Sequence, residues 1–246
     1  MRLHRNLSLL AIVLLAGFGA LARSDEGKDE VKEKALDAPN KDKLRVRMEG
    51  PYTADVPLQV VCYFKYTPEG AKRMGGAPVE LDKRLGGVIG SLRERGEFAA
   101  DQLETILITP PRASIKAKAL LLVGLGDEDA LSLKLMEAVG RVSLREAARL
   151  GVSRVAFAPL IRDQGNTKIP TGEVETAVVR GMLLAYDTDR RLQKEGLGKP
   201  FTLEEWWVEA GPAYFDETVA GVKKASAEAT DLIKARESKP YTSGKR

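Results

Sequence analysis

The sequence predicts an α/β domain built on a largely parallel sheet, and three neighbouring stretches carry that prediction. An apolar run at Ala119–Val123 lies inside the segment Ala117–Asp127, and a short run of this kind is typical of a strand buried on both faces. Apolar residues then recur at helical spacing over Leu131–Leu150. A second apolar stretch of strand length follows at Arg154–Leu160. Together they predict a strand–helix–strand unit, with Ala117–Val123 in the middle of the sheet.

Four further strands are expected, at Lys43–Glu49, Val56–Tyr66, Leu103–Thr109 and Phe201–Ala210. The first alternates apolar with basic residues, which suits an edge strand with one face in water. The last contains Trp206 and Trp207, and a final helix is expected after Gly211-Pro212. Because neighbouring strand residues point to opposite faces, one tryptophan ring should be buried and the other more exposed.

Glycines shape the segment after the second strand. Thr67–Pro78 contains several glycines and two prolines and is expected to be a loop. A helix is expected over Leu81–Gly96, although Gly86, Gly87 and Gly90 each cost about 1 kcal/mol against alanine. Such glycines permit the close approach of a ligand or of another backbone. Close packing on the sheet is the favoured explanation of the two.

The start of the chain has the plan of a secretory signal over residues 1–22. It has positive residues at Arg2 and Arg5, an apolar run too short for a comfortable membrane span, and small residues at Ala20-Leu21-Ala22. An uncleaved anchor helix is the alternative. We therefore expect an exported protein, periplasmic or secreted, with no stable membrane anchor after cleavage.

One folded domain is expected, over residues 44–236. Residues 23–43 include thirteen charged residues in twenty-one and should form a flexible leader. Residues 237–246 are polar and should fray as a flexible tail.

The composition excludes several kinds of chemistry. Removal of residues 1–22 lowers the formal net charge from +4 to +2, so no nucleic-acid partner is expected. Cys62 is the only cysteine, which rules out an intramolecular disulfide, and its apolar surroundings favour a buried, inert thiol. His4 is the only histidine and leaves with the signal. A mature chain without histidine cannot run a Ser-His-Asp or Cys-His mechanism or build a histidine zinc site. No metal or cofactor is expected.

The loop Leu160–Gly172 is the most promising binding surface. It should follow a central strand at its carboxyl end and run into a helix that Thr171 can cap. Open α/β sheets bind ligands at such an edge, and the backbone N–H groups of a helix start favour anions. Arg162, Asn166 and Lys168 add hydrogen-bond donors. A plain, mobile connection is the equally weighted alternative.

Three segments resemble the amino-terminal domain of the M17 (leucyl aminopeptidase) family. They are LDKRLGGVIGSLRERGEF at Leu81–Phe98, KALLLVGLG at Lys118–Gly126 and VVRGMLLAYDTDR at Val178–Arg190. Their order and spacing extend the resemblance over Leu44–Arg236. The resemblance implies a macro-domain-like, three-layer α/β/α fold with a mixed, largely parallel sheet of about six strands.

The resemblance also bears on activity. In complete family members a second, carboxy-terminal domain holds two metal ions and the peptidase residues, including an NTDAEGR motif. That motif does not occur here, so no catalytic or metal-binding residue can be carried over and no enzyme activity is expected. Related macro domains bind ADP-ribose with an NAAN motif. The matching segment here is Cys62-Tyr63-Phe64-Lys65, which lacks the asparagines and argues against ADP-ribose recognition.

In the macro-like arrangement the glycine-rich helix borders the same crevice as the loop after the central strand. The hypothetical ligand site therefore comprises Gly86, Gly87, Gly90, Arg162, Asn166, Lys168, Thr171 and Gly172. Backbone N–H groups from both sides would converge there on a small anionic ligand.

The overall expectation is an exported, non-catalytic binding or regulatory domain. A protein partner or self-association comes first, because in complete family members this domain contributes to hexamer architecture and regulation. An exposed apolar patch around Trp206 or Trp207 would mark such a surface. The alternative is a macro-like domain that binds or processes an anionic, nucleotide-type ligand. A third hypothesis is that a separate chain supplies a catalytic half.

The signal pattern makes a direct prediction about processing. Cleavage after Ala22 should remove residues 1–22, so the mature chain should begin at Arg23. Intact-mass measurement of protein from the native host tests this. A chain that retains Met1 in the cytosol would contradict export.

Overall fold

The computed structural model describes residues 31–39 and 43–236. The expected signal peptide (1–22) and tail (237–246) lie outside the described residues, as does most of the expected leader (23–43). Within the part that is described, none of the helices combines the length and hydropathy that a membrane span needs.

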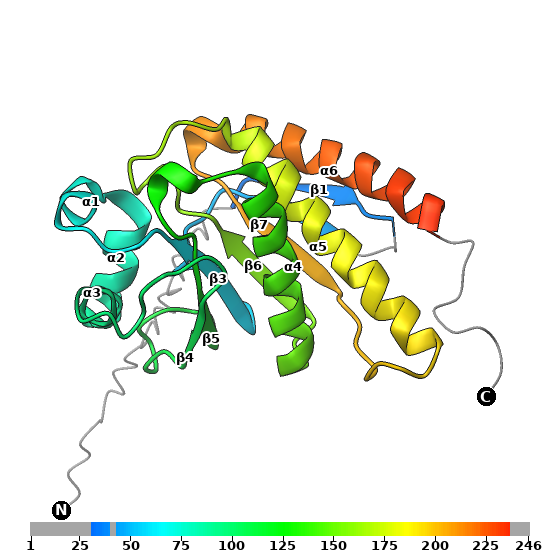
Figure 1. The fold of residues 1–246 in the computed structure, drawn as a ribbon, viewed down its shortest axis with the longest axis horizontal. Helices are drawn as coiled ribbons and strands as arrows, with labels where there is room; N and C mark the ends of the chain where they lie inside the picture. The colour runs from blue at the N-terminus through cyan, green and yellow to red at the C-terminus, as the bar shows by residue number, and fades with distance from the viewer. Residues whose placement is uncertain (1–30, 40–42, 237–246) are drawn as a thin grey trace, which may run out of the picture. The chain divides into compact units, whose positions relative to one another are not determined.

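One mixed sheet of seven strands organises the described residues (Figure 1). In spatial order the strands run β1-β2-β7-β6-β3-β5-β4. The five from β2 to β5 are parallel, and the two edge strands pair antiparallel to their neighbours. This confirms the predicted mixed, largely parallel sheet. The strands are β1 (Glu33–Asp37), β2 (Lys43–Arg47), β3 (Leu58–Tyr63), β4 (Thr105–Ile108), β5 (Ala119–Gly124), β6 (Arg154–Ala158) and β7 (Glu205–Glu209).

Two expectations about strand positions are wrong. Strand β5 is buried on both faces, as its apolar run predicts, but it lies next to the edge strand β4, and β6 occupies the middle. Burial on both faces therefore does not identify the central strand. The second correction is β1, which forms within the stretch expected to be a flexible leader and makes β2 an inner strand. One of its charged side chains, Glu33, pairs with Arg45 and Arg47 of β2.

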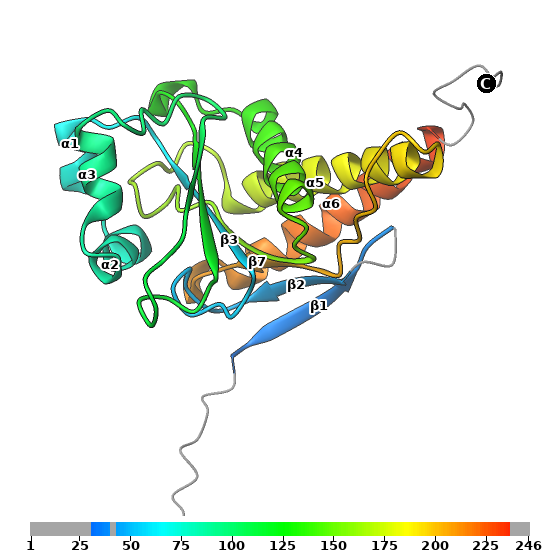
Figure 2. The ribbon, with the colours of Figure 1, turned by 90° about the horizontal axis from the view of Figure 1, so that it is seen from below.

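Helices cover both faces of the sheet (Figure 2). Side chains of β3 alternate between two hydrophobic clusters, one containing Val60 and Cys62 and the other Val61 and Tyr63. The first cluster packs against the long helices α4 (Leu133–Leu150), α5 (Thr171–Lys194) and α6 (Phe215–Arg236). The second includes side chains of the short helices α2 (Gly76–Arg84) and α3 (Val88–Glu94), whereas the preceding helix α1 (Pro68–Arg73) buries no residue. Two 3₁₀ turns, η1 (Glu128–Ala130) and η2 (Pro212–Tyr214), complete the elements.

The sole cysteine lies in this double-sided core. Cys62 is fully buried on β3, as the sequence predicts. Burial raises the pKa of its thiol, which therefore stays protonated and unreactive in the folded chain.

The glycine-rich segment forms three helices, whereas the sequence predicted a loop and one helix. Thr67 caps α1 by accepting a hydrogen bond from the Gly70 N–H at 2.9 Å. The expected single helix breaks at Gly86 and Gly87, whose φ angles of 72° and 81° are left-handed. A Cβ at either would meet nothing within 4 Å, so close packing does not explain these glycines. The backbone conformation does, because only glycine adopts it without strain.

The tryptophan expectation is also wrong, since both rings are buried. Trp206 is 0% exposed and Trp207 is 7% exposed. The Arg47 guanidinium lies 4.1 Å from the centroid of Trp207, and the indole N–H of Trp207 donates to Glu205. An apolar partner surface on these rings is therefore absent from the described structure.

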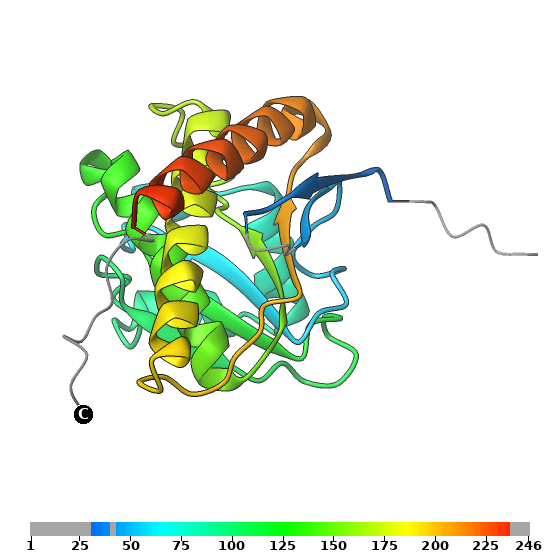
Figure 3. The same cartoon turned by 90° about the vertical axis from the view of Figure 1, so that its right-hand side faces the viewer.

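The three long helices pack backbone to backbone at glycines (Figure 3). A Cβ at Gly140 of α4 would lie 2.0 Å from the Val178 carbonyl oxygen of α5. A Cβ at Gly181 of α5 would lie 2.0 Å from the Glu137 carbonyl oxygen of α4. Contact between α5 and α6 is similar, with 2.3 Å between a Cβ at Gly221 and the Gly172 carbonyl oxygen. These helices could not approach as closely with any side chain at those positions.

Replacing one of these glycines should be costly. Gly181→Ala forces a methyl group onto a backbone oxygen that cannot turn aside, and it should lower the free energy of unfolding by about 3 kcal/mol. Gly211→Ala is the matched control, because its φ of −70° is ordinary and its Cβ has open space. Urea unfolding followed by circular dichroism measures both. Equal stability of the two variants would contradict close helix packing.

Candidate functional site

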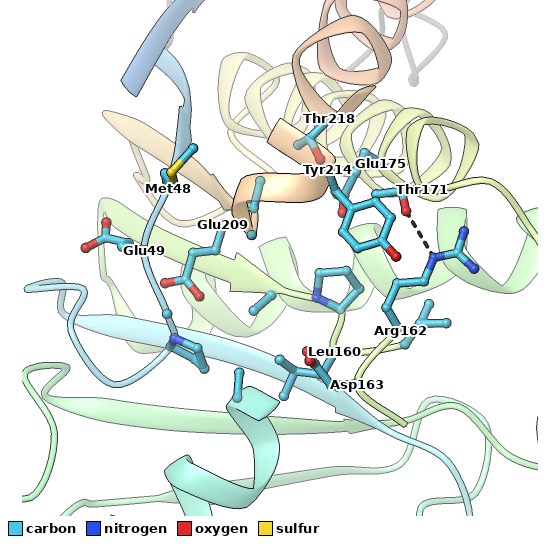
Figure 4. A pocket seen from close by; sticks show the side chains of 18 of the residues that line it. Met48, Glu49, Leu160, Arg162, Asp163, Thr171, Glu175, Glu209, Tyr214 and Thr218 are labelled. Carbon is cyan, nitrogen blue, oxygen red and sulfur yellow. Dashed lines mark hydrogen bonds between the residues drawn. The ribbon is translucent and has the colours of Figure 1, made fainter. Parts of the chain in front are cut away.

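A cavity of about 490 Å³ opens at the carboxyl ends of β2, β6 and β7 (Figure 4). Its walls come from the segments that follow these strands, namely Met48–Pro51, Ala158–Asp163 and Glu209–Pro212. The starts of α2, α5 and α6 close it. The structure thus places the beginning of the predicted loop Leu160–Gly172 at the carboxyl edge of the sheet, the position expected for a ligand site in an open α/β fold.

Four carboxyl groups line this cavity, those of Glu49, Asp163, Glu175 and Glu209. Glu209 is 6% exposed and extends from β7 into the space between Glu49 and Leu160 (Figure 4). Its Oε2 accepts a hydrogen bond from Gln59 Nε2 at 3.3 Å, and its Oε1 has no hydrogen-bond partner among the described residues. Glu175, in the second turn of α5, is 1% exposed, and its Oε2 also lacks a partner there.

Burial raises the pKa values of these four carboxyl groups. It raises the pKa of Glu209 well above its usual range, and the nearby Glu49 adds to this shift. Burial raises the pKa of Glu175 to about 8. The pKa values of Glu49 and Asp163 are also raised by burial, against the opposing effects of Arg47 and of the Ala77 N–H, respectively. At pH 7 the Glu175 carboxyl group is therefore mainly in its acid form, which can both donate and accept a hydrogen bond.

Arg162 lines the same cavity, but each of its three nitrogens already donates a hydrogen bond within the loop. Its Nε donates to the Thr171 hydroxyl at 3.1 Å, its Nη1 to the Asn166 carbonyl at 3.0 Å and its Nη2 to the Ile169 carbonyl. The guanidinium thus spans the loop and holds it in shape. The expectation that Thr171 caps α5 is wrong, because Pro170 is the N-cap residue and Thr171 lies in the first turn.

The other polar residues of the hypothetical site lie outside the cavity. Asn166 is buried, and its Oδ1 accepts a hydrogen bond from the Lys168 N–H. The ammonium of Lys168 pairs with Asp129. The Gly172 N–H donates to Glu217 Oε1 at 2.8 Å, which satisfies one of the free donors at the start of α5.

The glycines of the hypothetical site do not reach the cavity either. Gly86 and Gly87 form the break between α2 and α3, and Gly90 lies beside Asp82, whose Oδ2 accepts its N–H at 3.0 Å. The only wall residue from α2 is Ala77. The structure therefore brings Arg162 and Thr171 together at the cavity and leaves the other six predicted residues elsewhere.

Sequence analysis missed the three glutamates of the wall. A glutamate is usually solvated, so none of the three was expected to be buried. One signal was present for Glu209, because strand alternation puts it on the same face as Trp207, which a buried strand would cover. For Glu175 the sequence of its helix gives no comparable signal.

The fold and the position of the cavity define a macrodomain-like α/β protein. Over 82% of this chain, the structure matches a variant of the Oceanobacillus iheyensis macrodomain with a TM-score of 0.55 and 10% identity, covering 98% of that chain. It matches a variant of tomato leucine aminopeptidase with a TM-score of 0.59 and 18% identity, over 85% of this chain and 40% of that one. These likenesses confirm the predicted fold.

Residues 60–195 match the family model of the cytosol aminopeptidase family, N-terminal domain, and the chain belongs to this family. A probable cytosol aminopeptidase of Gloeothece citriformis is 30% identical over 136 residues, which is 55% of this chain and 26% of that protein. One of Roseiflexus castenholzii is 29% identical over 161 residues, 63% of this chain and 31% of that protein. The chain thus spans about a quarter to a third of the length of these relatives.

The buried carboxyl group of Glu175 predicts a pH dependence of stability. Its pKa rises from 4.5 to about 8 on folding, so the folded chain binds the proton more tightly than the unfolded chain. The free energy of unfolding should therefore fall, by the order of a few kcal/mol, as the pH rises from 5 to 8.

Glu175→Gln should reduce this slope and stabilise the chain at pH 8, because glutamine cannot ionise. Glu173→Gln, an exposed position in the first turn of the same helix, is the control. Chemical unfolding at several pH values measures the slopes. The same slope in both variants would mean that Glu175 is not protonated in the fold.

Proposed function

We propose that this chain is a non-catalytic domain that binds a small molecule in the cavity at the carboxyl ends of β2, β6 and β7, and that the ligand carries an amine. The observation behind this proposal is the pair Glu175 and Glu209. Both line the cavity, both are at least nine-tenths buried, and one oxygen of each lacks a hydrogen-bond partner among the described residues.

Unpartnered buried carboxyl groups are costly, which is why they are informative. A buried polar group without a hydrogen bond loses its interaction with water and gains nothing in return. An ammonium group beside Glu209 would restore that interaction as a charge-assisted hydrogen bond, and the carboxyl proton would leave to solvent. The apolar part of the wall, with Met48, Leu160 and Val174, suits the carbon skeleton of such a ligand.

An anionic ligand has less support at this cavity. Three of the five N–H donors of Arg162 are engaged with the loop, and the Gly172 N–H is engaged with Glu217. Four carboxyl groups surround the remaining space. A nucleotide-type ligand is still the second candidate, because an Oceanobacillus iheyensis macrodomain of the same fold has been solved with ADP. The carboxyl groups could accept from the amino group and hydroxyls of a nucleoside.

A protein partner has weaker support than a ligand. The large apolar side chains that are exposed among the described residues belong to six different elements or loops. They are Val79, Leu107, Leu133, Leu197, Tyr214 and Leu232.

Non-catalytic action is supported by the family match, which is to the N-terminal domain of the aminopeptidase family. Export remains part of the proposal and rests on the signal pattern of residues 1–22.

Three probes with one carbon skeleton test the ligand class: butylamine, butanol and butyrate, at equal concentration, pH and ionic strength. Butylamine should raise the Tm in a concentration-dependent way, and the other two should not, because only the ammonium pairs with Glu209. Glu209→Gln should weaken butylamine about tenfold, since a charge-assisted hydrogen bond is lost. Glu204→Gln, an exposed neighbour, is the control.

Titration with ADP separates the two candidates. Saturable ADP binding without an amine effect would replace the amine proposal by the nucleotide one. If neither probe binds, ligand binding at this cavity is wrong.

A further inference from the structure

A second, smaller cavity of about 60 Å³ lies at the carboxyl ends of β3 and β5, between the segments that follow these strands. Gln164 forms part of its wall and fixes its position. The Gln164 side chain accepts from the Phe64 N–H and donates to the Cys62 and Leu160 carbonyls, each at 3.0 Å. This cavity shares only Gln164's loop with the larger one, so its chemistry is independent of the proposed amine site.

Arg93 of α3 lines the second cavity and is only 6% exposed. It makes one hydrogen bond, from Nη2 to the Phe64 carbonyl at 3.0 Å, and its Nε has no partner among the described residues. Its guanidinium lies 4.8 Å from the ring centroid of Tyr63. An arginine has five N–H donors, so most of its hydrogen-bonding capacity is unused here.

The described structure provides no carboxylate in direct contact with Arg93. The nearest acidic influence is Asp82, whose two carboxylate oxygens accept the Ile89 and Gly90 N–H groups at the start of α3. Burial lowers the pKa of Arg93, but an arginine keeps its charge in proteins. A buried guanidinium without a counter-ion is unfavourable, because it has lost its hydration and gained no ion pair.

The acidic groups at the rim of this cavity already have cationic partners. Glu128 pairs with Arg73, and Asp127 lies 4.0 Å from Lys65. Lys65 in turn is 2.8 Å from Asp101. Arg93 is therefore the cation of this group that has no anion beside it among the described residues.

We propose that the second cavity binds a small oxyanion group, a phosphate or a carboxylate, through the guanidinium of Arg93. Two further donors line the cavity and can complete the site. The Thr67 hydroxyl accepts from the Gly70 N–H, which leaves its own hydrogen to donate. The Lys65 ammonium, which pairs with Asp101, also lines the cavity and has further N–H groups to donate. The small volume admits a group of a few heavy atoms, such as one phosphate.

The arginine Nε–H signals of the ¹⁵N-labelled chain provide the test. Inorganic phosphate and acetate are titrated separately at pH 7, with chloride holding the ionic strength constant. The Arg93 signal, assigned by its loss in Arg93→Gln, should shift and saturate with at least one of the two anions. Phosphate alone, acetate alone or both then identifies the oxyanion. A signal that does not move with either anion would overturn the proposal.

Variants separate binding from a purely structural role of Arg93. Arg93→Gln should weaken the anion about tenfold in calorimetric titration. Arg95→Gln is the control, since Arg95 is exposed at the end of the same helix and pairs with Glu97. If Arg93→Gln does not fold, Thr67→Val and Lys65→Gln should each weaken the anion severalfold. Unchanged affinity in both rim variants would contradict the site.

Discussion

The parallel course of five strands is the constraint on which the rest of this structure depends. Because β2, β7, β6, β3 and β5 run in the same direction, their carboxyl ends meet at one edge of the sheet. Every chain segment that leaves these strands must turn there, and both cavities form between those turns. Helices cover both faces of the sheet. Polar side chains can therefore be buried together mainly at this edge.

The loop after β6 divides that edge into two chemically opposite halves. On one side the wall carries the buried acids Glu175 and Glu209, and on the other the buried base Arg93. The loop itself is held by its own side chains, Arg162 binding its carbonyl groups and Gln164 binding the end of β3. Residues that look like ligand-binding donors in the sequence serve here as internal braces. The loop, held by these hydrogen bonds, therefore separates the two cavities.

The periodicity of apolar residues in the sequence predicted the strands and helices whose burial follows that periodicity. The apolar run at Ala119–Val123 and the helical stripe of α4 were recognisable because burial follows the period of each element. Strand β1 was not, because its charged residues are compatible with a sheet only when β2 supplies the opposite charges. Similarly, Glu209 resembles a solvated residue until Gln59, far away in the chain, is placed beside it. Arg162 and Thr171 of the hypothetical site do line the larger cavity, whereas its acids depend on long-range packing that no single segment reveals.

Because Cys62 is buried, its reactivity reports local opening of the sheet. The thiol lies on β3, within the hydrophobic cluster under the long helices, where no reagent in solution can reach it. Its alkylation therefore requires β3 to open, and the alkylation rate measures how often the sheet unfolds locally at this strand. Since the chain contains no other cysteine, that rate refers to one place in the fold. A ligand that binds the folded chain at the carboxyl edge of the sheet would lower this alkylation rate.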